Sequence, residues 1–397
     1  MTRVAFWYDY GVEYAGGLNY FRNLLYALSL VEHDKVVPYV FFGYDIDARI
    51  IKEFGQYASV VQTRVLTRKT FPWFVHRCLY RLFGLQWMVN GVLKRHAISV
   101  VSHPSMVAGK RRPYRLVTWI ADFQYLHLPE LFPGLDVDRK SAQLNAAIGE
   151  SDIVVLSSYD ACKDFNSIVA PGQVAKARVL QFVSQPDSRQ DDGRGRPDRT
   201  MLEQKFGFNG RYFFLPNQFW QHKNHKVVFD AVHMLKEQGM DIQLLCTGWL
   251  HDPRRGKSGY VNDLREFIEQ HGLAGHIRLL GSIEYAEVLA LFRHSVAVLN
   301  PSLFEGWSSS VEEAKSMGQR IVLSNIAVHL EQAPAGGVYF DPADPQCLAA
   351  ILADAWVNWP DGIDPAMEQA ARAQLRERTE QFGRRYLDII DELGTTP

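Results

Sequence analysis

Residues 296–324 read VAVLNPSLFEGWSSSVEEAKSMGQRIVLS, and the interpretation of the whole chain starts from this stretch. It holds an apolar run, a turn with an acid and a glycine, a short helical pattern closed by Gly318, and a second apolar run. This order predicts a strand, a loop, a helix and a second strand. Strands that alternate with helices in this way are the repeating unit of a parallel sheet.

The start of the predicted helix offers a binding site for an anion. The first N–H groups of a helix have no partner within it, and the macrodipole adds positive potential at the same end. Three consecutive serines, Ser308, Ser309 and Ser310, stand at this start. We therefore expect them to hold a phosphate group above the sheet.

Two acidic residues flank the same junction. Glu305 precedes the helix and Glu313 lies in its first turn. Both carboxylates can border one crevice and accept hydrogen bonds from hydroxyl groups there. A structural interpretation stays open, because Ser310 with Glu313, and Ser309 with Glu312, also match the capping-box pattern.

The composition bounds the class of protein. The chain has 397 residues, a formal net charge of −1 and 47% hydrophobic residues, which predicts two or three domains with apolar cores. The four cysteines are scattered and do not cluster with histidine, so we expect reduced thiols and no metal site. The N-terminus lacks a signal-peptide pattern, and no apolar run reaches about 18 residues, so we expect a cytoplasmic protein.

Apolar runs and helical patterns alternate through both halves of the chain. This predicts an α/β protein with two doubly wound, Rossmann-like domains. Residues 185–200 are charged and rich in proline and glycine, which is typical of a linker. We expect an N-terminal domain at 1–184, a C-terminal domain at 201–363 and a helical tail at 364–397 with a break near Gly383. The expected strands lie near residues 3–8, 36–42, 59–65, 98–102, 116–120 and 153–157, and then near 212–215, 242–247, 277–280, 296–299, 321–323 and 338–340.

Two more turns at the ends of expected strands carry candidate binding residues. Gly16 and Gly17 follow the first strand, and a glycine pair lets the backbone come close to a ligand. Lys223 follows the first strand of the second half, where an ammonium group can reach a diphosphate. The patterns G-x-x-x-x-G-K-[ST] and G-x-G-x-x-G do not occur, so a P-loop nucleotidase and the standard dinucleotide fingerprint are unsupported.

The acidic pair, the glycine after Glu305, the serine-rich turn and the closing Gly318 together resemble the family 4 retaining glycosyltransferases. The resemblance covers nearly the whole chain and is most specific over residues 300–318 and 217–225. It implies the GT-B fold, in which two Rossmann-like domains face each other across a cleft and a C-terminal helix crosses back to the first domain. In that family the second acid binds the ribose of the sugar nucleotide and the first borders the donor sugar. The resemblance assigns these roles to Glu313 and Glu305.

The same resemblance assigns further residues to the donor. Gly16 and Gly17 match the glycine loop of the family, which faces the donor phosphates and sugar. Lys223 falls on the lysine of the family's phosphate-binding pair, whereas Gln218 stands where most members have arginine. Diphosphate binding is therefore expected to depend on Lys223 and on the amides at the start of the helix.

One part of the family pattern is changed. Many relatives carry His-Asp just after the fifth expected strand, but this chain has Ala121-Asp122. Asp122 is carried over as a candidate catalytic residue, and His127 in the following segment is a weaker candidate for the missing histidine.

The resemblance implies transfer of mannose or another hexose from a nucleotide-diphosphate donor to a glycan or lipid-linked acceptor, in bacterial cell-surface polysaccharide synthesis. We expect no cofactor and no metal, because Lys223 and helix amides can stabilise the leaving diphosphate. An epimerase, a phosphorylase or a nucleotide-sugar-binding regulatory protein stays open as an alternative, since a fold does not determine a function. The expected catalytic residues are Glu305, Lys223 and Asp122, and the expected donor-binding residues are Gly16, Gly17, Gln218, Lys223, Ser308, Ser309, Ser310 and Glu313.

One region is strongly basic although the chain is nearly neutral. From Phe54 to Ala121 there is no Asp or Glu, and bases are interleaved with aromatic residues. This mixture favours peripheral contact with an anionic membrane surface, and the alternative is a helix that packs on the sheet with solvated bases. No nucleic-acid recognition module accompanies it, so we expect no nucleic-acid partner. The eleven bases are Arg64, Arg68, Lys69, Arg77, Arg81, Lys94, Arg95, Lys110, Arg111, Arg112 and Arg115.

Overall fold

The computed structural model divides the chain into two compact units, which are described separately. Unit 1 comprises Met1–Phe123, Asp136–Val183 and Glu377–Pro397, and unit 2 comprises Gln124–Leu135 and Ser184–Arg376. Both units are thus discontinuous in sequence, whereas the predicted limits of 1–184 and 201–363 treat each domain as one stretch and stay a prediction. The structure describes residues 1–8, 15–83, 85–104, 112–132, 134, 136–186, 197–250 and 259–394, and the central part of the predicted linker lies outside these ranges.

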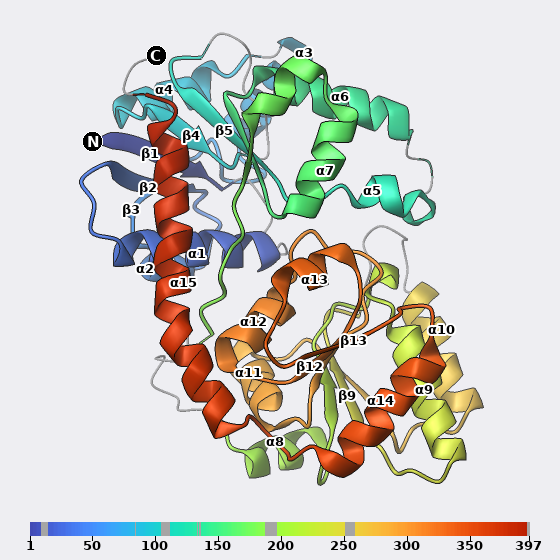
Figure 1. The fold of residues 1–397 in the computed structure, drawn as a ribbon. Coiled ribbons are helices and arrows are strands. Elements are labelled where there is room, and N and C mark those ends of the chain that lie inside the picture. Colours follow the sequence, from blue (N-terminus) through green and yellow to red (C-terminus); the bar gives the residue numbers. More distant parts are fainter. Residues whose placement is uncertain are drawn as a thin grey trace. The chain divides into compact units, whose positions relative to one another are not determined.

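Unit 1 is built on a seven-stranded parallel sheet with the order β3-β2-β1-β4-β5-β6-β7 (Figure 1). Its strands are β1 (Thr2–Trp7), β2 (Val36–Phe42), β3 (Ser59–Gln62), β4 (Val100–Ser102), β5 (Arg115–Ile120), β6 (Ile153–Leu156) and β7 (Ala177–Val179). Strand β7 was not predicted, because it has three half-buried residues at the sheet edge and offers no apolar run. The other six strands match the predicted ones.

Helices cover both faces of this sheet, because successive side chains of a strand point to opposite sides. Ala5 and Trp7 of β1 belong to one apolar cluster with residues of α4. Phe6 between them packs against Phe21 of α1 and against Tyr386 of the last helix, α15 (Pro365–Asp391), with ring centroids 5.8 Å apart in both pairs. The helices of this unit are α1 (Ala15–Leu30), α2 (Ala48–Phe54), α3 (Phe71–Phe83), α4 (Trp87–Arg95), α6 (Val137–Glu150), α7 (Tyr159–Ile168) and the 3₁₀ helix at Pro171–Lys176.

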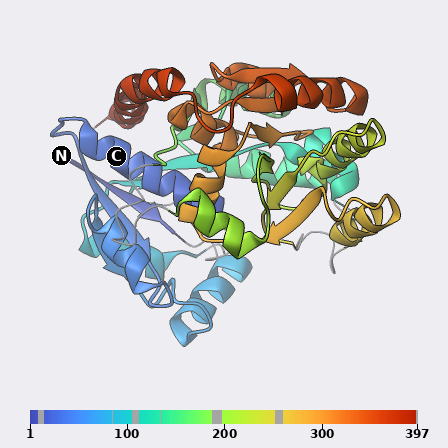
Figure 2. The ribbon, with the colours of Figure 1, turned by 90° about the horizontal axis from the view of Figure 1, so that it is seen from below.

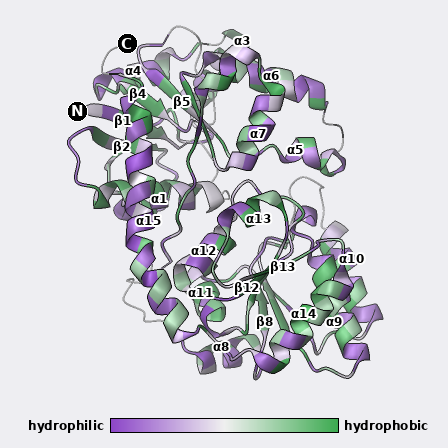
Figure 3. Ribbon diagram, viewed as in Figure 1, coloured by the Kyte–Doolittle hydropathy of each residue, from purple (hydrophilic) through white to green (hydrophobic). Residues whose placement is uncertain are grey.

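Unit 2 repeats the plan with a six-stranded parallel sheet in the order β10-β9-β8-β11-β12-β13. Its strands are β8 (Phe213–Leu215), β9 (Leu244–Thr247), β10 (Ile277–Gly281), β11 (Val298–Asn300), β12 (Ile321–Ser324) and β13 (Gly337–Phe340). All six match predicted strands. Most strands of both sheets are largely hydrophobic, as buried parallel strands are (Figure 3).

Helices also lie on both faces of the second sheet (Figure 2). Phe213 and Leu215 of β8 belong to an apolar cluster with α9, α10 and α14, and Phe214 between them belongs to a cluster with α8, α11 and α12. The helices of this unit are α5 (Gln124–His127), α8 (Arg199–Phe206), α9 (His225–Glu237), α10 (Gly259–Gln270), α11 (Tyr285–His294), α12 (Ser309–Met317), α13 (Ala327–Gln332), α14 (Pro345–Asn358) and the 3₁₀ helices at Pro129–Leu131 and Gln221–Lys223.

The last helix, α15 (Pro365–Asp391), has residues in both units. The predicted break near Gly383 is wrong, because the helix runs through this residue without interruption. Gly383 instead allows close packing: a Cβ there would lie 2.7 Å from the carbonyl oxygen of Ala27 and 3.0 Å from the side chain of Val31. The glycine therefore serves the contact between α15 and α1.

The α/β class with two Rossmann-like units is confirmed. In each sheet the chain starts near the middle, builds one side, and then crosses back to build the other, which is the doubly wound arrangement. None of the helices in the described ranges is both long enough and apolar enough to cross a membrane.

Candidate functional site

The candidate site lies where the strand order of the second sheet reverses, between β8 and β11. Ligands of doubly wound proteins bind at such a point, beyond the carboxyl ends of the strands. Asn217 follows β8 and Asn300 ends β11, and the side-chain amide of Asn217 donates to Oδ1 of Asn300 at 3.2 Å. Both residues are buried, so this contact fixes the two turns against each other.

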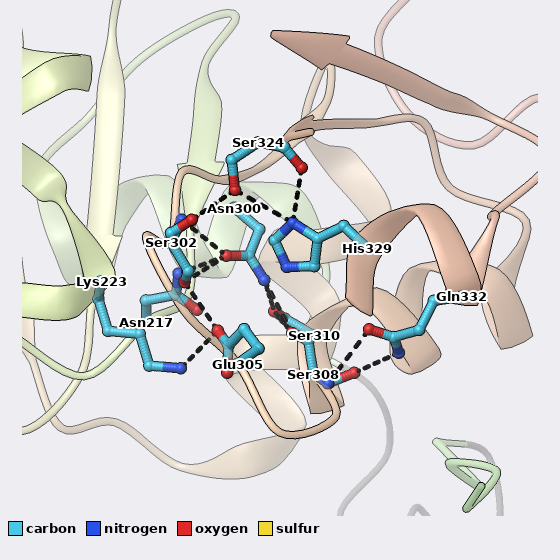
Figure 4. A network of polar contacts seen from close by, with 10 residues as sticks. All are labelled: Asn217, Lys223, Asn300, Ser302, Glu305, Ser308, Ser310, Ser324, His329 and Gln332. Atoms are coloured by element: carbon cyan, nitrogen blue, oxygen red, sulfur yellow. Dashed lines mark hydrogen bonds and ion pairs between the residues drawn. The ribbon is translucent and has the colours of Figure 1, made fainter. Parts of the chain in front are cut away.

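Asn300 organises the loop that follows β11 (Figure 4). Its Nδ2 donates to the hydroxyl of Ser308 at 2.8 Å and to that of Ser310 at 3.0 Å. Its Oδ1 lies 2.7 Å from the hydroxyl of Ser302. One buried amide thus joins the end of the strand to the start of α12, and the loop between them has little freedom.

Glu305 and Lys223, which were predicted as separate ligand contacts, form an ion pair. The Lys223 Nζ lies 2.6 Å from Oε1 of Glu305, and both side chains are largely buried. The hydroxyl of Ser302 lies 2.7 Å from the same oxygen. Burial acts to raise the pKa of Glu305, but the Lys223 charge and these hydrogen bonds outweigh it and lower the pKa below its ordinary value. The carboxylate is therefore ionised at neutral pH.

This pairing determines what Lys223 can offer to a ligand. An ammonium group has three protons, and Lys223 donates one of them to the Glu305 carboxylate in a hydrogen bond. A bound diphosphate would accept a hydrogen bond from another proton of the same ammonium group. Glu305 would hold this ammonium group in place beside the diphosphate.

The first turn of α12 differs from the prediction in its details. The helix begins at Ser309, and its N-cap, Ser308, makes no side-chain capping bond. The amide of Ser308 donates to Oε1 of Gln332 at 3.2 Å, and the Ser308 carbonyl accepts from Nε2 of Gln332 at 3.0 Å. The hydroxyls of Ser308 and Ser310 face Asn300. The backbone amides of Ser309 and Ser310 are therefore what the helix start offers to a phosphate, and this role stays a prediction.

Neither capping box is formed, because Ser308 is the N-cap and Ser309 and Ser310 lie inside the helix. Glu312 accepts from Nε2 of Gln332 at 3.2 Å. Glu313 is 6% exposed and accepts from the hydroxyl of Tyr285, at the start of α11, at 2.6 Å. The phenol fixes one carboxylate oxygen of Glu313, and its predicted role toward a ribose stays open to test.

Gln218, at the predicted arginine position, has a structural contact. Its Oε1 accepts from the backbone amide of Trp249, after β9, at 2.6 Å. The adjacent Gly248 has a φ of +150°, and a Cβ there would lie 2.4 Å from the carbonyl oxygen of Asn217. Gln218 thus fixes the turn after β9 against the turn after β8. The arginine that most members of the resembled family have at this position would add a positive charge instead.

The remaining predicted residues belong to unit 1, apart from His127. Gly16 and Gly17 lie in the first turn of α1, and a Cβ at Gly16 would meet no atom within 4 Å, so packing does not require that glycine. Residues 9–14 of the predicted glycine loop lie outside the described ranges. Asp122 is exposed just after β5. His127 is grouped with unit 2, where its ring centroid lies 4.9 Å from that of Phe304.

Sequence reasoning missed several residues of this network, namely Asn217, Asn300, Tyr285, His329 and Gln332. Each of them contacts a residue of another segment, and nothing in its local pattern marks it. The only available signal was the position of the two asparagines at the ends of expected strands. In the described part of the chain, no three His, Cys, Asp or Glu side chains are placed to hold a metal ion together.

One family model matches the part of the chain that contains this geometry. The family model described as glycosyl transferases group 1 matches residues 198–377. This range contains the whole network around Asn300 as well as Gln218 and Glu313.

One curated relative and several solved structures are similar to the chain. The O-antigen chain mannosyltransferase RfbU of Salmonella typhimurium is 21% identical over 173 residues, which cover 43% of this chain and 46% of that protein. The similarity thus spans about half the length of the curated relative. The Anabaena protein HepE in complex with UDP-glucose has a TM-score of 0.65 and 16% identity, with full coverage of both chains. WaaG, a glycosyltransferase involved in lipopolysaccharide biosynthesis, has a TM-score of 0.59 and 16% identity and covers 98% of this chain and 100% of its own. These likenesses confirm the predicted GT-B fold.

Proposed function

We propose that this chain, whose residues 198–377 form a group 1 glycosyltransferase domain, transfers a hexose from a nucleoside-diphosphate donor with retention of configuration. The observation that carries the proposal is the buried ion pair between Lys223 and Glu305 at the strand-order reversal, beside the start of α12. A cation, a carboxylate and helix amides at one point match the diphosphate and the sugar hydroxyls of such a donor.

The proposed donor contacts follow from this geometry. Lys223 and the amides of Ser309 and Ser310 bind the diphosphate, Glu305 accepts from hydroxyls of the sugar, and Glu313 accepts from the ribose. Glu305 is suited to its part because its carboxylate is ionised and already held in place by Ser302 and Lys223.

The proposed reaction is a front-face displacement. The bond between C1 of the sugar and the diphosphate oxygen breaks, and the acceptor hydroxyl oxygen forms the new bond to C1 on the same face. The acceptor proton passes to the departing diphosphate. Negative charge grows on that diphosphate in the transition state, where Lys223 and the helix amides stabilise it. The proposal predicts turnover without an added divalent ion and leaves Asp122 of unit 1 as a candidate on the acceptor side.

The donor and acceptor classes are proposed from the relatives. The Salmonella relative is named a mannosyltransferase of the O-antigen chain, and the Anabaena structure contains UDP-glucose. We therefore propose a hexose donor, a glycan or lipid-linked acceptor, and a place in bacterial cell-surface polysaccharide synthesis.

A membrane-facing surface on unit 1 is part of this proposal. Six large apolar side chains around α3 and α4 are between 48% and 80% exposed, although most large apolar residues of a globular protein are buried. Exposed bases occur in the same segments of the chain, which suits an anionic leaflet. We name this region the α3–α4 surface; it comprises Phe71, Phe74, Leu82, Phe83, Leu85 and Trp87 with Arg64, Arg68, Lys69, Arg77, Lys94 and Arg95.

Part of the predicted basic region does not belong to this surface. Arg112 and Arg115 bind the carboxylate of Asp152, at 2.6 Å and 3.1 Å, and so serve the sheet. Lys110 and Arg111 lie outside the described residues, and the side chain of Arg81 is likewise not described. Six of the eleven predicted bases therefore support the proposed membrane-facing surface.

The decisive experiment is to incubate the protein with a panel of sugar nucleotides and lipid or glycan acceptors, and to measure release of nucleoside diphosphate. A glycosyltransferase releases it in an acceptor-dependent way and forms a product whose anomeric configuration, read by NMR, matches that of the donor. A nucleotide-sugar-binding regulatory protein would bind a donor without releasing diphosphate, and an epimerase would change the sugar while it stays attached to the nucleotide.

A further inference from the structure

His329, on α13, is completely buried beside the ion pair and has no part in the function proposed above. Its Nδ1 lies 2.9 Å from the carbonyl oxygen of Ser324 and 3.1 Å from the hydroxyl of the same residue. A carbonyl oxygen only accepts hydrogen bonds, so Nδ1 must carry the proton. The tautomer of this histidine is therefore fixed by its neighbour.

A chain of hydrogen bonds leads from His329 to the candidate carboxylate (Figure 4). The hydroxyl of Ser324 donates to the carbonyl oxygen of Ser302 at 2.5 Å, so it accepts, and does not donate, toward His329. The hydroxyl of Ser302 in turn lies 2.7 Å from Oε1 of Glu305. The carbonyl of Ser302 is thus held by His329 through Ser324, and the Ser302 hydroxyl lies between Oε1 of Glu305 and Oδ1 of Asn300, to either of which it can donate its one proton.

The ring is poorly explained as a space-filling residue. Nε2 of His329 is buried and has no hydrogen-bond partner among the described residues. An apolar side chain would avoid this unsatisfied acceptor, so the histidine is not the best choice for packing alone. Burial lowers the pKa of His329 to about 4, although the nearby Glu305 acts to raise it. The ring is therefore neutral at pH 7 and supplies a hydrogen-bond donor without adding a second positive charge beside Lys223.

We propose that His329 is a positioning residue for Glu305 and acts through Ser324 and Ser302. The proposal rests on the glycosyl transfer proposed above, in which Glu305 faces the donor sugar. Without the Nδ1 proton, Ser324 and Ser302 lose their fixed orientation, and Glu305 no longer meets the sugar in the geometry of the transition state. Because a small displacement at the reacting group costs rate more than binding, the effect falls mainly on kcat.

The test compares two substitutions that differ in whether they keep a hydrogen-bond donor. The side chain introduced by His329→Asn is smaller than imidazole, but its amide can place an N–H near the position of Nδ1, whereas His329→Leu fills the space without a donor. We expect His329→Leu to lower kcat about 10- to 100-fold with less than about a threefold change in donor KM, and His329→Asn to restore most of the rate. Ser324→Ala should match His329→Leu, and the double variant should be no slower than the slower single variant, because both break one chain.

Leu330→Ala is the matched control, because Leu330 lies on the same helix and is 53% exposed. Its kcat should equal that of the native protein. Rates are expressed per binding-competent protein, determined by titration with the nucleoside diphosphate. A purely structural role predicts equal kcat in all folded variants, and this result would overturn the proposal.

A binding measurement separates this inference from the proposed function. Because the effect falls mainly on kcat, His329→Leu should leave the Kd of the nucleoside diphosphate and that of the complete donor within about threefold of the native values. A native protein that binds neither ligand contradicts the proposed function itself. A native protein that binds and turns over a donor, with an unchanged kcat in His329→Leu, contradicts only the role of His329.

Discussion

At the scale of single residues, the candidate site is a small set of buried hydrogen bonds around Asn300 and Glu305. The residue types in the 296–324 stretch predicted Glu305, Glu313 and the serines as one group, and the strand turn predicted Lys223. The pairing of Lys223 with Glu305 could not be predicted, because it joins positions 82 residues apart and depends on how β8 and β11 lie next to each other. The same holds for the contact between Asn217 and Asn300.

Glu313→Gln should weaken binding of the donor nucleotide about 10- to 100-fold, because a hydrogen bond to a charged carboxylate is worth about 1.5–3 kcal/mol. Tyr285→Phe, which removes the phenol that orients this carboxylate, should have a smaller effect in the same direction. Calorimetric titration with a nucleoside diphosphate measures both variants. Pyrophosphate, which has no ribose, serves as the matched ligand, and its affinity should stay the same. Equal nucleotide affinity in Glu313→Gln and the native protein would exclude the ribose contact.

At the scale of strands and helices, the pattern of apolar runs predicted twelve of the thirteen strands in the described ranges correctly. The failure at Gly383 has a physical reason. A glycine in a helical pattern is compatible with a break or with close packing, and only the neighbouring helix decides between them. Strand β7 was missed because an edge strand of three residues has no pattern long enough to recognise.

Gly383→Ala should destabilise the protein by about 1–3 kcal/mol, because the added methyl group meets the backbone of α1 and must be accommodated by strain. Gly91→Ala in α4 is the matched control, since a Cβ there meets no atom within 4 Å. This second substitution should stabilise the protein by about 0.5–1 kcal/mol, as it removes a flexible residue from a helix. Denaturant unfolding of both variants gives the comparison. Shifts of the same sign would contradict the packing role of Gly383.

Asp152, at the junction between α6 and β6, should make stability depend on pH. Burial acts to raise its pKa, but the hydrogen bond from the Leu116 amide and the charges of Arg112 and Arg115 outweigh burial and lower the pKa below the ordinary value. A carboxylate with a lowered pKa stabilises the folded state above its unfolded pKa, and this contribution is lost as the pH falls through the folded pKa. Asp152→Asn should therefore cost about 1–2 kcal/mol at pH 7, reduced by its partial exposure, and almost nothing well below pH 4. A difference in the free energy of unfolding that stays constant from pH 7 to pH 3 would contradict this account.

At the scale of the whole molecule, the two doubly wound units could be predicted from the alternation of elements, whereas the order of their strands comes from the structure. The assignment of residues 124–135 to unit 2 and of residues 377–397 to unit 1 could not, because it depends on tertiary contacts of short segments. Composition also could not show that the bases of the region from Phe54 to Ala121 have two different roles. Net charge and spacing could not separate the bases that bind Asp152 from those of the α3–α4 surface.

The α3–α4 surface predicts salt-sensitive binding to anionic membranes. Each base near an anionic leaflet contributes about 1 kcal/mol, so changing Arg64, Arg68 and Arg77 to Gln should weaken binding about 100-fold. The triple change of Arg139, Lys140 and Lys163 to Gln removes the same charge from positions on α6 and α7 and should have little effect. Flotation with anionic and neutral vesicles at low and high salt measures this. An equal loss of vesicle binding in both triple variants would mean that binding depends on net charge and not on the α3–α4 surface.

The central claim is that Lys223, held by Glu305, stabilises the leaving diphosphate, and one rate comparison tests it most directly. Lys223→Met keeps the length of the side chain and removes its charge. Lys226→Met is the control three residues away, where the exposed lysine pairs with Asp230 on the surface of α9. With the donor that the native protein uses, we predict that kcat for nucleoside diphosphate release falls at least about 100-fold in Lys223→Met and stays unchanged in Lys226→Met. A kcat of Lys223→Met within about threefold of the native value would contradict the account.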